Sequence, residues 1–217
     1  MRLSILNCAQ VVESSYGLVR AIKRNQIPPN VVDHMNHKGA QAVMLDHNVL
    51  VIPGSNELVD WFRNFDTFKI AGQTFSARTA TRHRTGAFFH SGFYKHAGLI
   101  LEFAKDNKAQ FIIGHSLGAA AAQILGTSLN VPTVGFASPR VKKGNGRLKN
   151  EKRVLNICRV DDLVTRVPPS EVGFRRLGRS VRLVPPKNNP GMDHSMPNYI
   201  DALGYDTFGG PLPRTWR

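Results

Sequence analysis

The sequence predicts an α/β fold in which a mostly parallel central sheet is flanked by helices. Apolar runs at Phe111–Ile113, Val131–Ala137 and Val154–Val160 have the length and composition of buried strands. The first run is followed, after a short turn, by AAAAQIL, which is a strong helix former. A chain of 217 residues suits one such domain, spanning residues 1–217, with a substantial core.

The remaining elements follow from periodicity and from turn residues. Loosely helical spacing of apolar residues over 1–26, ended by Pro28-Pro29, predicts a helix packed on the sheet. The other expected elements are a hairpin of Gln41–Leu45 and Val49–Ile52, a strand pair within Phe68–Thr81, a helix over Phe93–Lys105, one strand or extended segment at Arg175–Val184, a helix over Ser195–Leu203 and an irregular tail at Gly209–Pro213.

The turn Gly114-His115-Ser116-Leu117-Gly118 joins the first apolar run to the helix former. A G-x-S-x-G turn between a strand and a helix is typical of the nucleophile elbow of an α/β-hydrolase. Only glycine tolerates the close backbone approach at its two ends. The motif predicts Ser116 as a nucleophile, and the backbone N–H of Leu117 as one donor to the oxyanion.

A serine nucleophile needs a base and an orienting acid, which follow it in this architecture in the order Ser, acid, His. Of the eight histidines only His194 lies beyond Ser116, so the order selects His194 as the base. Asp161 and Asp162 directly follow an apolar strand, where such an acid is expected. From context alone the pair stays open, and either aspartate can be the acid.

Several segments in a consistent order make residues 40–203 resemble the class 3, fungal-type triacylglycerol lipases. The segments are VIPGSNELVDWFRNFD, FFHSGFYKHA, FIIGHSLGAAAAQIL, TVGFASPRVKKGN, RVDDLVTRVPP and DHSMPNYIDAL. The resemblance implies that Asp162 is the acid and that Ser55 donates to the oxyanion. It also implies a lipid or other carboxylic ester as substrate. Pro53 and Thr165 depart from the residues that the family often has there, namely Arg and Pro.

Residues 56–66 carry Leu58, Trp61, Phe62 and Phe65 on one helical face. Two interpretations stay open: a small lid that opens on a lipid surface, or a fixed helix whose aromatic face belongs to the core.

The sequence shows no metal-ligand spacing and no phosphate-binding glycine loop, so we expect no cofactor and no metal. Cys8 and Cys158 are expected to be free thiols. The first ten residues lack a signal-peptide pattern, and no stretch is long enough to span a membrane. We therefore expect a cytoplasmic protein, with release by lysis or virion association left open. The oligomeric state is not predicted.

The chain carries 29 Lys and Arg against 15 Asp and Glu, a net charge of +14. Residues 140–187 account for most of this excess. Such a surface attracts anionic phospholipid, nucleic acid or an acidic partner, or it is simply a solvated basic face. Phe174 is the one aromatic residue among these charges, so a stacking platform for bases is not indicated and nucleic acid is the less expected partner. We expect some of Arg166, Arg175, Arg176 and Arg179 near the substrate entrance, facing an anionic membrane.

Two classes of function therefore remain. The first is a lipase-like ester hydrolase that uses Ser116, Asp162 and His194. The second is a weak or inactive hydrolase-fold binding protein that uses its basic surface on lipid, nucleic acid or an assembly partner.

Overall fold

The computed structural model describes residues 1–55, 67–70, 73–76, 80–83, 86–185, 187, 193–205, 207–208 and 210–217, with only the backbone of 67–70, 73–76 and 207–208. Its helices are α1 (Ile5–Lys23), α3 (Ser91–Asp106), α4 (Leu117–Leu129) and α5 (Met196–Ala202). None of the helices in this part of the chain is long and apolar enough to cross a membrane.

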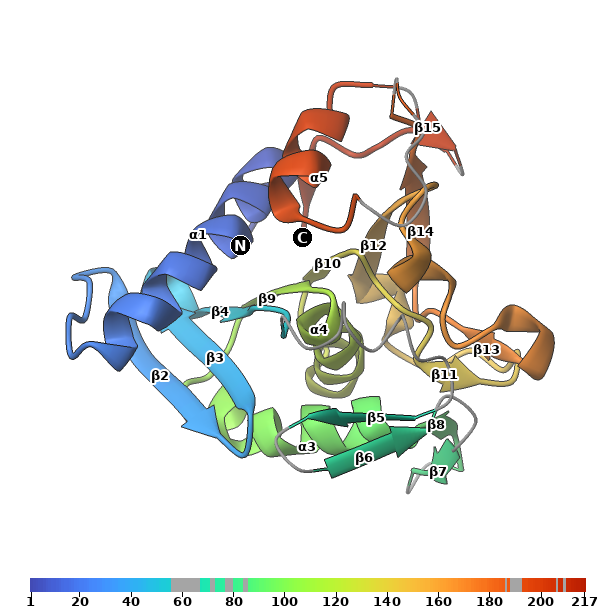
Figure 1. Cartoon of the computed structure of the whole chain (residues 1–217), viewed down its shortest axis with the longest axis horizontal. Coiled ribbons are helices and arrows are strands. Elements are labelled where there is room, and N and C mark those ends of the chain that lie inside the picture. The colour runs from blue at the N-terminus through green and yellow to red at the C-terminus, as the bar shows by residue number, and fades with distance from the viewer. Residues whose placement is uncertain are drawn as a thin grey trace.

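An eight-stranded sheet forms the centre of the molecule (Figure 1). Its spatial order is β15 (Thr207–Phe208), β14 (Arg179–Leu183), β12 (Val154–Arg159), β10 (Thr133–Phe136), β9 (Phe111–His115), β4 (Val49–Ile52), β3 (Ala40–Leu45) and β2 (Val31–His37). The five strands from β14 to β4 are parallel, whereas β15, β3 and β2 pair antiparallel. The predicted α/β-hydrolase architecture with a mostly parallel sheet is confirmed.

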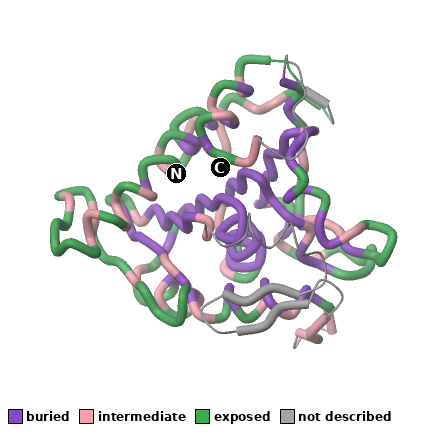
Figure 2. The backbone as a smooth tube through the Cα atoms, in the orientation of Figure 1, coloured by how far each residue is buried: buried purple, intermediate pink, exposed green. Residues whose placement is uncertain are grey.

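The two faces of the sheet carry separate cores because neighbouring strand residues point to opposite sides. Leu50, Ile52 and Ile112 pack with α3 and α4 on one face. Val49, Val51 and Phe111 pack with α1 and α5 on the other. Figure 1 shows these helix pairs on either side of the sheet, and Figure 2 shows the buried strands between them. Each fully buried aliphatic side chain of this kind contributes about 1.5–3 kcal/mol.

Smaller sheets complete the fold. They comprise β5 (Thr67–Ile70) with β6 (Gln73–Ser76), β1 (Leu3–Ser4) with β16 (Thr215–Trp216), and the order β13 (Phe174–Arg175), β11 (Lys142–Lys143), β8 (Phe88–His90), β7 (Ala80–Arg82). The β5–β6 pair confirms the strand pair expected within Phe68–Thr81. Short 3₁₀ turns lie at Asp46–Asn48, Glu151–Arg153, Leu163–Arg166 and Ser170–Val172.

The structure differs from the sequence prediction at both ends of the chain. Strand β2 follows Pro28-Pro29 and was not predicted, because most of its residues are exposed and it reads as polar. Residues 210–213 are irregular, as expected, but β16 just beyond them pairs with β1, a pairing that was not predicted and that brings the two chain ends together (Figure 1). Both differences come from long-range pairing that no local pattern reports.

Candidate active site

Ser116 lies in the turn between β9 and α4, as the elbow motif predicts. Its backbone has φ 58° and ψ −121°, a conformation that non-glycine residues rarely adopt. A Cβ on Gly114 would lie 2.4 Å from the Gly118 carbonyl oxygen, and a Cβ on Gly118 would lie 2.0 Å from that of Ile52. Glycine is therefore required at both positions, and the closely packed turn holds the strained serine at the start of α4.

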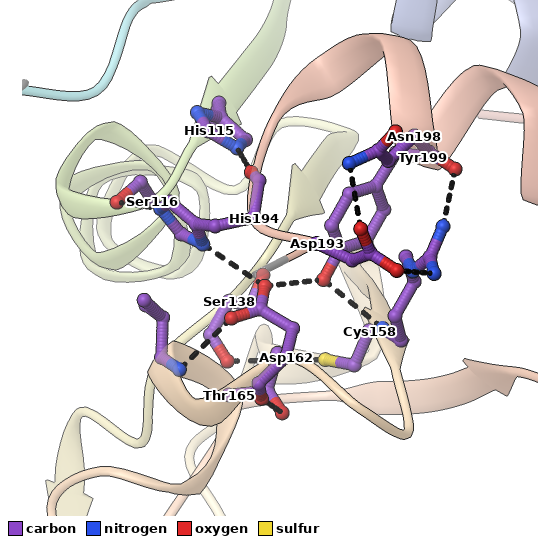
Figure 3. Close-up of polar contacts among 12 residues, drawn as sticks. His115, Ser116, Ser138, Cys158, Asp162, Thr165, Asp193, His194, Asn198 and Tyr199 are labelled. Atoms are coloured by element: carbon purple, nitrogen blue, oxygen red, sulfur yellow. Dashed lines mark hydrogen bonds and ion pairs between the residues drawn. The ribbon is translucent and has the colours of Figure 1, made fainter. Parts of the chain in front are cut away.

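Figure 3 shows His194 between Ser116 and Asp162. His194 Nε2 lies 2.8 Å from Ser116 Oγ, and His194 Nδ1 lies 3.0 Å from Asp162 Oδ2. The three predicted residues thus meet at the carboxyl ends of β9 and β12 and just before α5. This is the hydrogen-bonding order of a Ser-His-Asp triad.

Three donors hold the Asp162 carboxylate. Besides His194, the Tyr199 hydroxyl donates to Oδ2 at 2.7 Å, and the Val164 N–H donates to Oδ1 at 2.9 Å. Burial raises the pKa of Tyr199 above its ordinary value, so the hydroxyl keeps its proton and acts as a donor. The carboxylate is thereby fixed in orientation towards the imidazole.

Asp161 and Asp162 face different partners, which separates the two candidates that sequence context left open. Asp161 accepts two hydrogen bonds from the buried Arg159 guanidinium, from Nε at 3.0 Å and from Nη2 at 2.9 Å. Only Asp162 of this pair has a hydrogen bond to His194. The acid that the resemblance selected is therefore the one placed for triad chemistry.

Arg159 also reaches the segment that carries His194. Its Nη2 donates to Asp193 Oδ2 at 2.5 Å, and its Nη1 donates to the Asn198 carbonyl oxygen at 2.8 Å. Asn198 in turn donates to Asp193 Oδ1 at 3.0 Å. One guanidinium thus binds the residue preceding each of Asp162 and His194, which ties the acid turn to the histidine segment.

A second chain of hydrogen bonds supports His194 from the other side. His115 Nε2 donates to the His194 carbonyl oxygen at 2.9 Å, and His115 Nδ1 accepts from Tyr16 Oη at 2.6 Å. Tyr16 Oη accepts in turn from the Gly54 N–H at 3.0 Å. Burial, and to a smaller extent the nearby His194, lower the pKa of His115 to about 3, so the imidazole stays neutral.

The segment predicted to carry the oxyanion donors lies beside the nucleophile. A Cβ on Gly54 would lie 2.8 Å from Ser116 Cβ, so the end of β4 is pressed against the serine. Ser55 follows at once and is half-buried. Leu117 is the first residue of α4, where the N–H groups have no acceptor within the helix. Both predicted donors therefore border the position of Ser116.

The possible lid at residues 56–66, with Leu58, Trp61, Phe62 and Phe65, lies outside the described residues.

The four arginines expected near the entrance divide into two groups. Arg166 donates to the Val160 carbonyl oxygen, and Arg176 donates to those of Ser138 and Thr165, so both border the Asp162 turn. Arg175 and Arg179 instead lie by the amino end of β14, away from the triad. Arg159, which the sequence reading counted with the basic surface, is buried.

Cys8 and Cys158 are free and buried, as expected. Within the described part of the chain, no three His, Cys, Asp or Glu side chains gather in a group that could hold a metal ion.

Sequence reasoning missed the supporting residues Tyr16, His115, Arg159 and Tyr199. His115 was set aside because it precedes the serine, although its place inside the elbow signals proximity. Tyr199 lies in the predicted histidine segment, five residues after His194. Tyr16 and Arg159 carry no local signal, because their roles depend on contacts with distant segments.

A model of the family described as lipase (class 3) matches residues 49–172, more than half of the chain. A search of curated proteins gives no match.

Solved structures of fungal lipases are similar in fold. Lipase II from Rhizopus niveus is 14% identical, with a TM-score of 0.61 over 85% of this chain and 83% of that one. The Rhizomucor miehei lipase in its propeptide complex is 16% identical, with a TM-score of 0.56 over 90% and 77%. The lipase from Rhizopus microsporus var. chinensis is 17% identical, with a TM-score of 0.56 over 88% and 79%.

Proposed function

We propose that this chain, which belongs to the class 3 lipases, is a serine hydrolase that cleaves carboxylic esters of lipids through an acyl-enzyme. The observation that carries the proposal is the hydrogen-bonded series from Ser116 Oγ through His194 to Asp162. Tyr199 and Val164 fix the acid, and Arg159 and His115 fix the two segments around the base.

The geometry suits the acyl-transfer sequence of a triad. Ser116 Oγ attacks the ester carbonyl carbon while His194 Nε2 takes its proton. The tetrahedral intermediate collapses when His194 returns that proton to the leaving alcohol. Water activated by the same nitrogen then attacks the acyl-enzyme, which releases the carboxylic acid and regenerates Ser116. Asp162 remains a carboxylate throughout and stabilises the imidazolium.

The developing oxyanion needs donors aimed at it before the reaction begins. We assign this role to the backbone N–H of Leu117 and to Ser55, through its N–H and its hydroxyl. The adjacency of Gly54 to Ser116 supports the assignment, because it leaves Ser55 at the mouth of the nucleophile turn. The positive amino end of α4 adds a favourable field for the negative charge.

The proposed substrate class is a neutral lipid or other carboxylic ester. The solved structures with a similar fold include one of a triacylglycerol lipase, and this likeness makes glycerides the first class to test. Phospholipids and short-chain esters are the other arms of the same test.

A fluorophosphonate probe tests the proposal, because it labels a serine only where a base activates it. We expect stoichiometric labelling of the wild-type chain and none of Ser116→Ala. Hydrolysis of p-nitrophenyl butyrate by that variant should fall by more than about 10⁴-fold. Ser14→Ala, which alters an exposed serine on α1, is the matched control and should behave as wild type. A wild-type chain that neither reacts with the probe nor hydrolyses any ester would overturn the proposal.

A further inference from the structure

Two hollows lie side by side at the edge of the sheet opposite the triad. The first, of about 810 Å³, is lined by residues of the 145–152 loop, by Arg175–Arg179 and by Trp216. The second, of about 820 Å³, is lined by Arg2, by residues just before β9, β10 and β12, and by Arg217. The Trp216 indole donates to the Arg153 carbonyl oxygen at 2.7 Å, and this contact divides the two hollows.

The position of the hollows relative to Ser116 follows from the elements between them. Asn150 donates to the carbonyl oxygen of Thr127, in the last turn of α4, at 3.2 Å. Ser116 caps the first turn of the same 13-residue helix. At 1.5 Å per residue the helix separates the two sites by about 20 Å. The hollows therefore form a surface of their own, distinct from the catalytic site.

The lining of the hollows is strongly cationic. Its basic residues are Arg2, Arg147, Lys149, Lys152, Arg153, Arg175, Arg176, Arg179 and Arg217. Among the described lining residues Glu151 is the one acidic side chain, and its Oε2 pairs with Arg175 Nη2 at 3.0 Å. Most of the positive charge of the described lining residues is therefore left without an acidic side chain beside it in the same lining.

These cations divide into wall-forming and free side chains. Arg175 donates to the carbonyl oxygens of Gly144 and Gly146, which shapes the 142–147 turn. Arg147, Lys149 and Lys152 are exposed, and no hydrogen bond or ion pair joins them to another described residue. Three exposed charges thus lie within residues 147–152, beside side chains that hydrogen bonds hold in place.

We propose that this basic edge, made of the residues lining the two hollows, binds nucleic acid through its phosphate backbone. Seven of its nine cations are arginines. Arg175, Arg176 and Arg179 donate to backbone carbonyl oxygens and form walls. The exposed Arg147 presents a planar fork that matches phosphate oxygens with two hydrogen bonds. The charges extend over two adjacent hollows, which fits an extended polyanion with phosphates at regular intervals.

An anionic membrane fits this edge less well. A bilayer resting on this edge would lie about 20 Å from Ser116, because the proposed hydrolytic site is at the opposite edge of the sheet. Apolar side chains that protrude into the interface strengthen the binding of a protein to a membrane. Of the large apolar lining residues, Val131, Leu148 and Trp216 are partly buried. Among the described lining residues Met1 is the one exposed large apolar side chain, so the edge offers little apolar surface to a bilayer.

Fluorescence anisotropy with labelled 20-nucleotide single-stranded and duplex DNA, at 50 and 200 mM NaCl, tests the proposal. The variant carries Arg147→Gln, Lys149→Gln and Lys152→Gln. The control loses the same charge through Lys23→Gln, Arg24→Gln and Lys38→Gln, all exposed and located at the end of α1 and in the β2–β3 turn. Raising the salt from 50 to 200 mM weakens the part of the binding that comes from three phosphate contacts by about 20- to 40-fold. The variant lacks these contacts, so its affinity for DNA should depend less steeply on salt.

We expect the wild type and the control to bind DNA alike, and the triple variant to bind at least tenfold more weakly at 50 mM NaCl. Equal weakening of both variants would overturn the proposal in favour of net charge alone. Absence of DNA binding by the wild type, with binding to phosphatidylglycerol vesicles through the same three residues, would assign the edge to a membrane. Displacement of DNA by polyglutamate at matched charge concentration would assign it to an acidic protein.

The test is independent of the proposed hydrolysis. Ser116→Ala should bind DNA as the wild type does, and the triple variant should hydrolyse p-nitrophenyl butyrate at the wild-type rate.

Discussion

The two edges of the central sheet differ in how their charged side chains are buried and paired. At the carboxyl edge, Arg159, Asp161 and Asp162 are almost entirely buried, and each is hydrogen-bonded within a closed network. At the amino edge, Arg147 and Lys149 are exposed and make no such bond to the described residues. Buried charges are costly unless every one is paired, whereas exposed charges are cheap and remain available to a partner.

The difference predicts how each edge responds to mutation. Loss of one charge at the carboxyl edge should disturb either the chemistry or the fold, because its partner stays buried. Loss of one charge at the amino edge should change binding and leave the fold intact.

Among changes of a charged residue, the largest effect is expected from Asp162→Asn. The amide keeps the size of the side chain but no longer stabilises the imidazolium, and it favours the wrong His194 tautomer. We expect kcat for p-nitrophenyl butyrate to fall by about 10⁴-fold with little change in KM. Steady-state kinetics measures the split, and a loss of less than tenfold would mean that another group serves as the acid.

Asp161→Asn should act on stability instead. It removes one charge from a buried pair with Arg159, which costs about 3 kcal/mol because Asp193 still holds the guanidinium. The melting temperature should fall by about 6–12 °C. Activity at 25 °C should stay within about tenfold of wild type, since Asp161 has no hydrogen bond to His194 in the structure. An unchanged melting temperature with a kcat as low as that of Asp162→Asn would reverse the roles of the two aspartates.

The residues of the triad could be predicted from the sequence because they depend on local motifs and on their order along the chain. The elbow is a contiguous turn, and Gly114 is required by its close approach to Gly118, four residues away. Gly118 is required by its close approach to Ile52 on the neighbouring strand. His194 followed from chain order alone. Asp162 required the resemblance, because two adjacent aspartates after one strand look alike until their partners are seen.

The supporting residues could not be predicted in the same way. Tyr16 and His115 are 99 positions apart in the chain, and Arg159 and Asp193 are 34 apart, so only the folded sheet brings them together. Arg159 was counted with the basic surface because charge composition does not report burial. Strand β2 was missed for a related reason: its polar, exposed residues form a strand only because β3 offers an edge.

Stability at acid pH should depend on two buried histidines. Burial lowers the pKa of His115 to about 3 and that of His96 to about 4. The unfolded chain takes up these protons near pH 6.5 while the folded chain does not, so the free energy of unfolding falls as pH drops from about 6.5 towards 4. Each histidine contributes up to about 1.4 kcal/mol per pH unit.

Variants of the two histidines distinguish an effect at the carboxyl edge from an effect on the stability of the fold alone. His115→Gln and His96→Gln should each flatten the pH dependence measured by urea unfolding at pH 4, 5, 6 and 7. Only His115→Gln should also lower kcat, because His115 alone donates to the His194 carbonyl oxygen. If both variants kept the wild-type kcat, the hydrogen bond from His115 would have no part in holding the base.

The smallest effect is expected from Glu151→Gln, which removes the acidic side chain of the amino edge. Its partner Arg175 still donates to the carbonyl oxygens of Gly144 and Gly146. The Arg175 side chain is 24% exposed, so water solvates the guanidinium once the Glu151 carboxylate is gone. We expect a stability loss of about 1 kcal/mol or less and unchanged ester hydrolysis. With one fewer negative charge in the hollows, DNA should bind about twofold more tightly at 50 mM NaCl, and the gain should shrink at 200 mM. Thermal unfolding and anisotropy measure the two quantities. A destabilisation as large as that of Asp161→Asn would show that the two edges do not differ in how they hold charge.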